Sequence, residues 1–159
     1  MSTTILPPTA DIETPWMLVA RAELGTRERL PNGKPNPRIA EYFQSTGFKG
    51  GDADDAWCSA FANWVMARVW SDTDGDPALH GTGKANARSW LDWGRPIERW
   101  QYGCIAIYSR PPKPGSGHVH FVVSETPGYL RGLGGNQNNR VCIKQYPEAR
   151  LLGLRMPAV

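Results

Sequence analysis

The sequence predicts an α+β fold, with helices in the first part of the chain and an antiparallel β-sheet in the second. Apolar residues recur with the 3.6-residue period of a helix as far as Leu91, and after residue 100 they follow the two-residue period of a strand. At 159 residues the chain has the size of one domain. Its 17 glycines and 14 prolines indicate many turns between short elements.

Two short helices are expected near the N-terminus. An N-cap residue followed by proline at the first helical position occurs twice, at Thr14-Pro15 and at Asn36-Pro37. The first helix has an apolar stripe that ends before Gly25, a residue that can terminate a helix. The second has a short apolar face that ends before Gly47.

A longer helix is expected to begin at Cys58, after a loop rich in glycine and aspartate. Apolar side chains surround this segment almost completely as far as Val69, which is typical of a helix buried at the centre of a fold. A fourth, shorter helix is expected over Ala87–Leu91 and ends at Gly94.

Strands follow in the last third of the chain, and the alternation predicts an antiparallel sheet packed against the helices. The expected strands are Cys104–Tyr108, His118–Val123, Tyr129–Leu133, Val141–Tyr146 and Leu151–Leu154. We assign residues 1–13 to a loose leader and residues 14–159 to a single domain.

Composition argues against several classes of protein. The net charge of +3 is too small to indicate a nucleic-acid-binding protein, which usually carries a clustered basic stripe. Apolar runs fall far short of the ~18–20 residues that span a bilayer, so no membrane insertion is expected. The first residues lack the basic and apolar regions of a Sec signal, so we expect synthesis in the cytoplasm and export, if any, by another route. The three cysteines form no CxxC motif, which argues against a disulfide framework or a zinc knuckle.

Cys58 is a candidate nucleophile because it stands at the predicted start of the central helix. A helix N-terminus favours thiolate over thiol. With a pKa of about 8.5 a thiol is only ~3% ionised at pH 7, and lowering the pKa by ~2 units makes it mostly thiolate. The alternative is that Cys58 is a small buried hydrophobe.

His118 is the candidate base. It begins a strand after Gly117, where its side chain can face a cleft, and a neutral imidazole beside a thiol can take the thiol proton. His120 has the same side-chain direction and either shares the cleft or lies on its rim. Asn136 is the candidate for orienting the imidazole through its far nitrogen, although Gly-Asn sequences are also typical of a hairpin turn.

With these residues the chain resembles the CHAP and NlpC-type cysteine hydrolases of bacterial peptidoglycan, particularly small members associated with phages or secretion systems. The resemblance runs from about Pro15 to Pro157. Its landmarks are Pro15-Trp16, Glu23-Leu24-Gly25, Trp57-Cys58-Ser59-Ala60-Phe61, Gly81-Thr82-Gly83, Ala87-Arg88-Ser89-Trp90, Gly117-His118-Val119 and Leu133-Gly134-Gly135-Asn136-Gln137. It implies a papain-like core, with Cys58 as nucleophile, His118 as general base and acid, and Asn136 as the residue that orients His118.

Three positions depart from the family pattern. Many CHAP domains have glutamate where this chain has Gly134, so the third residue of the site is either Asn136 or Gln137. Relatives usually have a small residue in place of His120, and the strand that often opens Gly-Asp opens Gly103-Cys104 here.

The resemblance implies hydrolysis of an amide bond in the peptide stem of peptidoglycan, by an N-acetylmuramoyl-L-alanine amidase or an endopeptidase. Such a protein acts on the cell wall as a phage lysin or as an antibacterial effector, for example of a type VI secretion system. An effector would have a cognate immunity protein that occludes its cleft. The alternatives are a catalytically silent wall-binding domain and a cysteine peptidase that acts on proteins.

No cofactor is expected, with calcium as a minor alternative. Asp52, Asp54 and Asp55 precede Cys58, and Asp72-Thr73-Asp74-Gly75-Asp76 partly resembles a calcium loop without its distal glutamate. Solvated loop charges are the simpler interpretation of both. Trp57 is either a core residue or an aromatic wall of the cleft.

Overall fold

The computed structural model describes residues 13–72 and 80–158. The helices in these residues are α1 (Pro15–Ala22), α2 (Pro37–Phe43), α3 (Cys58–Asp72) and the short 3-10 helices η2 (Ala87–Asp92) and η3 (Glu148–Arg150). Of the leader expected over residues 1–13, only Glu13 is described. Its carboxylate accepts a hydrogen bond from the hydroxyl of Tyr102 and lies 3.4 Å from Nε of Arg21.

Both predicted helix starts are confirmed. The Thr14 hydroxyl accepts a hydrogen bond from the backbone N–H of Met17 at 3.3 Å, and Pro15 follows in the first turn. The Asn36 side chain accepts from the N–H of Arg38 at 3.0 Å, with Pro37 next. α3 begins at Cys58 as predicted, whereas the fourth helix is a 3-10 helix.

A six-stranded antiparallel sheet follows, with strand order β1-β6-β2-β3-β4-β5. Its strands are β1 (Arg95–Ile97), β2 (Ile105–Ser109), β3 (Gly117–Thr126), β4 (Tyr129–Gln137), β5 (Arg140–Pro147) and β6 (Leu151–Met156). The α+β class and the five predicted strands are therefore confirmed. β1 was not predicted from the sequence, because this strand has only three residues, contains Pro96 and shows no apolar alternation.

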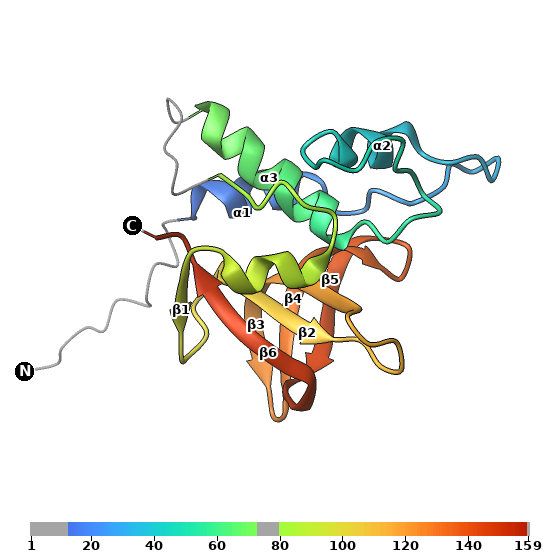
Figure 1. The fold of residues 1–159 in the computed structure, drawn as a ribbon. Coiled ribbons are helices and arrows are strands. Elements are labelled where there is room, and N and C mark those ends of the chain that lie inside the picture. Colours follow the sequence, from blue (N-terminus) through green and yellow to red (C-terminus); the bar gives the residue numbers. More distant parts are fainter. Residues whose placement is uncertain (1–12, 73–79, 159) are drawn as a thin grey trace, which may run out of the picture.

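α1, α3 and η2 cover one face of the sheet (Figure 1). α3 lies against β3 and β4, and η2 lies against β2, β3 and β6. The core between the layers contains Phe61 and Val65 from α3 together with Ile107, Val119 and Leu133 from the sheet. A smaller apolar cluster lies on the opposite face of the sheet and contains Cys104, Ala106, Tyr108, Val122, Leu130 and Leu154.

A partly buried ion pair joins α1 to α2. Glu23 directly follows α1 and is only 8% exposed. Both of its carboxylate oxygens accept hydrogen bonds from Arg38, at 2.7 and 2.9 Å, and one also accepts from the Tyr42 hydroxyl at 2.7 Å. Burial acts to raise the pKa of Glu23, but the bonds from Arg38 and Tyr42 outweigh it and lower that pKa.

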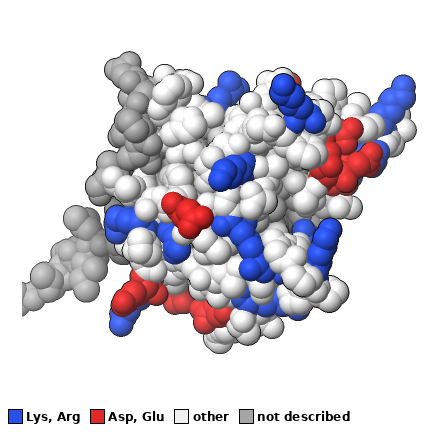
Figure 2. All heavy atoms as spheres, in the orientation of Figure 1, with Lys and Arg blue, Asp and Glu red and all other residues white. Residues whose placement is uncertain are grey.

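Among residues 13–72 and 80–158, no helix has the length and apolar character needed to cross a bilayer. Figure 2 shows basic and acidic side chains interspersed with uncharged surface on this face of the molecule.

Candidate active site

Cys58 is the first residue of α3 and is 2% exposed. The start of the helix lies close against β4, because Gly135 has no side chain. A Cβ at that position would lie 2.7 Å from atoms of Phe61 and Trp57. The packing of Trp57 on β4 therefore fixes where the first turn of α3, and with it the Cys58 sulfur, meets the sheet.

His118 lies on β3, and the backbone that follows it passes the Cys58 sulfur. The backbone N–H of Val119 interacts with the sulfur of Cys58 and favours its thiolate form, so the sulfur lies next to the peptide bond that joins His118 to Val119. The His118 side chain is 1% exposed and stacks on the ring of Tyr146, with centroids 4.4 Å apart and planes 19° apart. Tyr146 thus holds the plane of the imidazole.

Gln137, on β4, holds the far nitrogen of that imidazole. Its Oε1 lies 2.8 Å from Nε2 of His118 and 3.1 Å from Nδ1 of His120. Its Nε2 donates to the backbone carbonyls of Gly132 at 3.1 Å and Cys142 at 2.6 Å. Because carbonyl oxygens only accept, these two bonds fix the orientation of the amide, with Oε1 toward the histidines.

This orientation determines the tautomers of both histidines. Oε1 of Gln137 can only accept, so Nε2 of His118 and Nδ1 of His120 must each carry a proton. A neutral His118 then has its lone pair on Nδ1, which is buried and has no hydrogen-bond partner among the described residues. That lone pair is the one a general base would use toward a thiol.

His120 is a buried part of the same network and does not lie on the rim of a cleft. Its Nε2 lies 2.8 Å from the hydroxyl of Tyr108, which donates to it. The ring lies over two glycines of β4: a Cβ at Gly132 would come within 2.3 Å of the ring, and a Cβ at Gly134 within 2.7 Å of the His120 Cβ. Gly134 would also carry its Cβ 2.8 Å from Oε1 of Gln137. The two departures from the family pattern, His120 and Gly134, therefore depend on each other.

The expectation that Asn136 orients His118 is wrong in this structure. Nε2 of His118 is paired with Gln137, and Nδ1 has no partner in the described part of the chain. A register shift between β4 and β5 falls at residues 134–137, and Asn136 has a φ of 57°. This irregularity breaks the simple alternation of side chains and turns Gln137, the alternative third residue, toward the histidines.

The protonation states also differ from the expectation of a preformed thiolate. Burial raises the pKa of Cys58, and the backbone N–H groups of Val119, Ser59 and Cys58 only partly oppose it. Burial lowers the pKa of His118 to about 4, against the hydrogen bond to Gln137, and lowers that of His120 to about 3. Near pH 7 these shifts favour a neutral Cys58 thiol and a neutral His118 imidazole, and no hydrogen bond joins the two side chains in the described part of the chain.

A surface pocket of about 370 Å³ opens at Cys58. One side is formed by the segment before η2, and the other by the loop that leads into β3. Its lining residues are Ala56, Cys58, Ala85, Asn86, Ala87, Lys113, Pro114, Gly115, Ser116 and Gly117. A substrate in this pocket would approach the sulfur along the loop that precedes β3, and His118 is not among the lining residues.

Trp57 is a core residue and does not line this pocket. Its side chain is fully buried, stacks on Tyr42 with centroids 5.8 Å apart, and donates its indole N–H to Glu28 at 3.0 Å. Sequence reasoning did not single out Glu28, Tyr108 or Tyr146. Nothing in the local pattern marks them, since each contacts the site only through the tertiary fold.

The aspartates before Cys58 stabilise their own loop. Asp52 accepts a hydrogen bond from the N–H of Asp54 at 2.9 Å, Asp55 accepts from the N–H of Asp52 at 3.1 Å, and Asp54 pairs with Arg29. Within residues 13–72 and 80–158 no group of three or more histidine, cysteine, aspartate or glutamate side chains could hold a metal ion. The other candidate calcium loop, after Asp72, lies outside the described residues.

All three cysteines are free thiols. Neither a scan against protein-family models nor a search of curated proteins finds a match for this chain.

Proposed function

We propose that this protein is a cysteine hydrolase that cleaves an amide bond in the peptide stem of bacterial peptidoglycan. The observation that carries the proposal is the buried set of Cys58, His118 and Gln137. The sulfur lies beside the His118 peptide, and Gln137 holds the imidazole with its free nitrogen unpartnered. The sequence resemblance to CHAP and NlpC-type enzymes supports peptidoglycan as the substrate, and we propose with it the papain-like core that this resemblance implies.

In the proposed reaction, Nδ1 of His118 removes the proton of the Cys58 thiol as the sulfur attacks the amide carbonyl carbon. A C–S bond forms, and the carbonyl electron pair moves to oxygen, where the backbone N–H of Cys58 is a candidate donor. The proton on Nδ1 then passes to the leaving amine as the C–N bond breaks. Water, deprotonated by His118, hydrolyses the thioester and releases a carboxylate and the thiol.

Gln137 and Tyr146 position the base during these steps. The imidazolium formed in the reaction keeps Nε2–H directed at Oε1 of Gln137, which stabilises its positive charge. Because both partners start neutral, proton transfer has to accompany attack, as in a serine hydrolase, and the reaction does not begin from a standing ion pair.

We propose delivery to the cell wall either as an antibacterial effector of a secretion system or as a phage lysin. In the first case a cognate immunity protein would cover the pocket at Cys58. No cofactor is required for the proposed chemistry, since the nucleophile and the base are side chains of this chain.

The decisive experiment is mass spectrometry of purified peptidoglycan after digestion with the wild type and with Cys58→Ala. Fragments are expected from the wild type alone, and their masses identify the bond that is cut. Cys104→Ala is the matched control, because it removes a second buried thiol that does not line the pocket at Cys58, and it should leave the fragments unchanged. The absence of fragments with the wild type would overturn the proposal.

One observation favours a second candidate, a catalytically silent wall-binding domain. Both Cys58 and His118 are almost fully buried, and their pKa values are displaced away from the charged pair. Wall binding that is unaffected by Cys58→Ala, without hydrolysis by the wild type, would support this candidate. Cleavage of casein with peptidoglycan left intact would instead indicate a peptidase that acts on proteins.

A further inference from the structure

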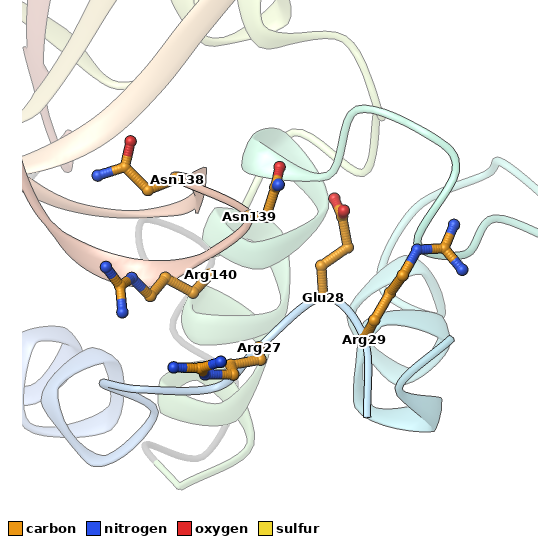
Figure 3. A pocket seen from close by; sticks show the side chains of 6 residues that line it. All are labelled: Arg27, Glu28, Arg29, Asn138, Asn139 and Arg140. Carbon is orange, nitrogen blue, oxygen red and sulfur yellow. The ribbon is translucent and has the colours of Figure 1, made fainter. Parts of the chain in front are cut away.

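A second pocket lies near the turn between β4 and β5 and has a volume of about 360 Å³ (Figure 3). Its lining residues are Arg27, Glu28, Arg29, Asn138, Asn139 and Arg140. Arg27 and Arg140 form an isolated antiparallel bridge, so the loop after α1 runs alongside the start of β5. Figure 3 shows both guanidinium groups extending to the same side of this bridge.

The other charged side chains of the pocket are already engaged. Arg29 forms an ion pair with Asp54 and donates to the carbonyl of Gly33 at 3.2 Å. Glu28 accepts the indole N–H of Trp57 and extends away from the two arginines. In the described part of the chain, no hydrogen bond or ion pair is formed by the guanidinium of Arg27 or Arg140, and Nε of Arg140 is buried without a partner.

This arrangement is unfavourable at the half-buried Arg140, whereas Arg27 is exposed to solvent. Like charges directly opposite each other on paired backbone segments repel, and a buried donor without an acceptor has a desolvation penalty. An anion between the two guanidinium groups would remove both penalties. A planar carboxylate suits this position, because guanidinium groups bind its two oxygens in parallel hydrogen bonds.

The pocket is connected to the candidate active site in two ways. Arg140 is paired in register with Gln137, the residue that holds His118. Trp57 bonds to Glu28 in the pocket wall and directly precedes Cys58. The pocket therefore shares a strand pair with the residue that holds His118 and a wall residue with the segment that leads into Cys58.

We propose that Arg27 and Arg140 bind a free carboxylate of the substrate peptide, as an anion subsite that selects acidic over amidated peptide stems. The inference rests on the proposed function for the identity of the substrate. The subsite itself follows from two unpaired arginines that the fold holds side by side.

The test uses the full chain carrying Cys58→Ala, which binds without cleaving. Calorimetric titration compares two muropeptides that differ only in whether the stem glutamate carries a free α-carboxylate or an α-carboxamide. We expect the acid to bind at least about tenfold more tightly, since hydrogen bonds between a guanidinium and a carboxylate are charge-assisted. Adding Arg27→Gln or Arg140→Gln should remove this preference, because each variant should weaken binding of the acidic muropeptide and leave binding of the amide unchanged. Arg95→Gln, an exposed arginine on the opposite edge of the sheet, is the control and should preserve it.

Two further titrations distinguish a peptide carboxylate from other anions. Inorganic phosphate and glycerol phosphate should bind more weakly than the acidic muropeptide, and tighter binding of either would overturn the assignment to a peptide carboxylate. Equal affinity for acid and amide would also overturn it, even if the wild type cleaves peptidoglycan. Discrimination without any hydrolysis by the wild type would support the subsite while the proposed function fails. Thermal unfolding of each variant shows whether a lost preference reflects lost folding.

Discussion

Oε1 of Gln137 accepts hydrogen bonds from two histidine rings, and the bond from Nε2 of His118 is the shorter, at 2.8 Å. The amide reaches this position because its nitrogen is held by two backbone carbonyls. The imidazole of His118 is therefore fixed in one tautomer before any substrate binds. Preorganisation of this kind removes the need to reorient the base during the reaction.

Replacing Gln137 by Ala should lower kcat far more than it raises KM, because the variant releases the tautomer and the orientation of His118. We expect a loss of about 10²-fold in kcat, the lower range for removal of acid–base function. Asn136→Gly is the matched control. It deletes the neighbouring side chain while allowing the positive φ of that residue, and it should retain most of the activity. Equal losses in the two variants would contradict the assignment of Gln137.

The pH profile of kcat/KM should have an acidic limb near pH 4. His118 acts as a base only when it is neutral, and burial lowers its pKa to about 4, so activity should hold from pH 7 to 5 and fall as the pH approaches that value. A limb near 6.5, the ordinary histidine value, would show that the imidazole is solvated in the working enzyme.

The free energy of unfolding should decrease as the pH falls below about 6.5, before activity is lost. The folded-state pKa values of His118 and His120, about 4 and about 3, lie below the unfolded value of about 6.5. The unfolded chain therefore binds more protons as the pH falls below 6.5, and the free energy of unfolding decreases through that window. Urea unfolding at pH 7, 5.5 and 4.5 measures the decrease. His120→Asn should make the dependence shallower, and an unchanged slope would argue against a buried neutral His120.

Gly134→Ala should disturb the site without touching the nucleophile or the base. Its Cβ would overlap both His120 and the amide oxygen of Gln137. We expect a loss of about 1–3 kcal/mol in the free energy of unfolding, together with reduced kcat. Adding His120→Ala opens space for the new methyl group, so the double variant should be more stable than the sum of the single changes predicts. Strict additivity in chemical denaturation would contradict the coupling.

Arg38→Met should destabilise the contact between α1 and α2. It leaves the Glu23 carboxylate buried with only the Tyr42 hydroxyl as its remaining side-chain donor. We expect the free energy of unfolding to decrease by about 2–3 kcal/mol. This is below the range for a fully buried pair, because Arg38 is a third exposed. Glu23→Gln in the Arg38→Met background should recover part of the loss, because it removes the uncompensated charge. The midpoint of urea unfolding at pH 7 measures both.

The helix starts and most strands could be predicted because their signals are local. Thr14-Pro15 and Asn36-Pro37 carry their own caps, and strand alternation needs only neighbouring residues. The choice between Asn136 and Gln137 could not be made in this way. It depends on a register shift between two strands, which reverses the direction of side chains without leaving a clear mark in the sequence.

The protonation states of Cys58 and His118 could not be predicted from the neighbouring sequence either. A helix N-terminus predicts a lowered pKa for Cys58. In the fold the sulfur is buried against the sheet, and the loss of solvent raises that pKa more than the backbone N–H groups lower it. The pairing of Arg27 with Arg140 is a similar case, because 112 intervening residues must fold before the two meet.

Cys142 has a consequence for chemical labelling of this protein. Its thiol donates to the backbone carbonyl of Gln137 at 3.2 Å, its own carbonyl accepts from the Gln137 amide, and its side chain is more exposed than that of Cys58. A maleimide or iodoacetamide reagent should therefore modify Cys142 first, and the added bulk would displace the amide that orients His118. Inactivation by such a reagent would then occur with the nucleophile intact, so covalent inhibitors have to be assigned to a residue by peptide mapping.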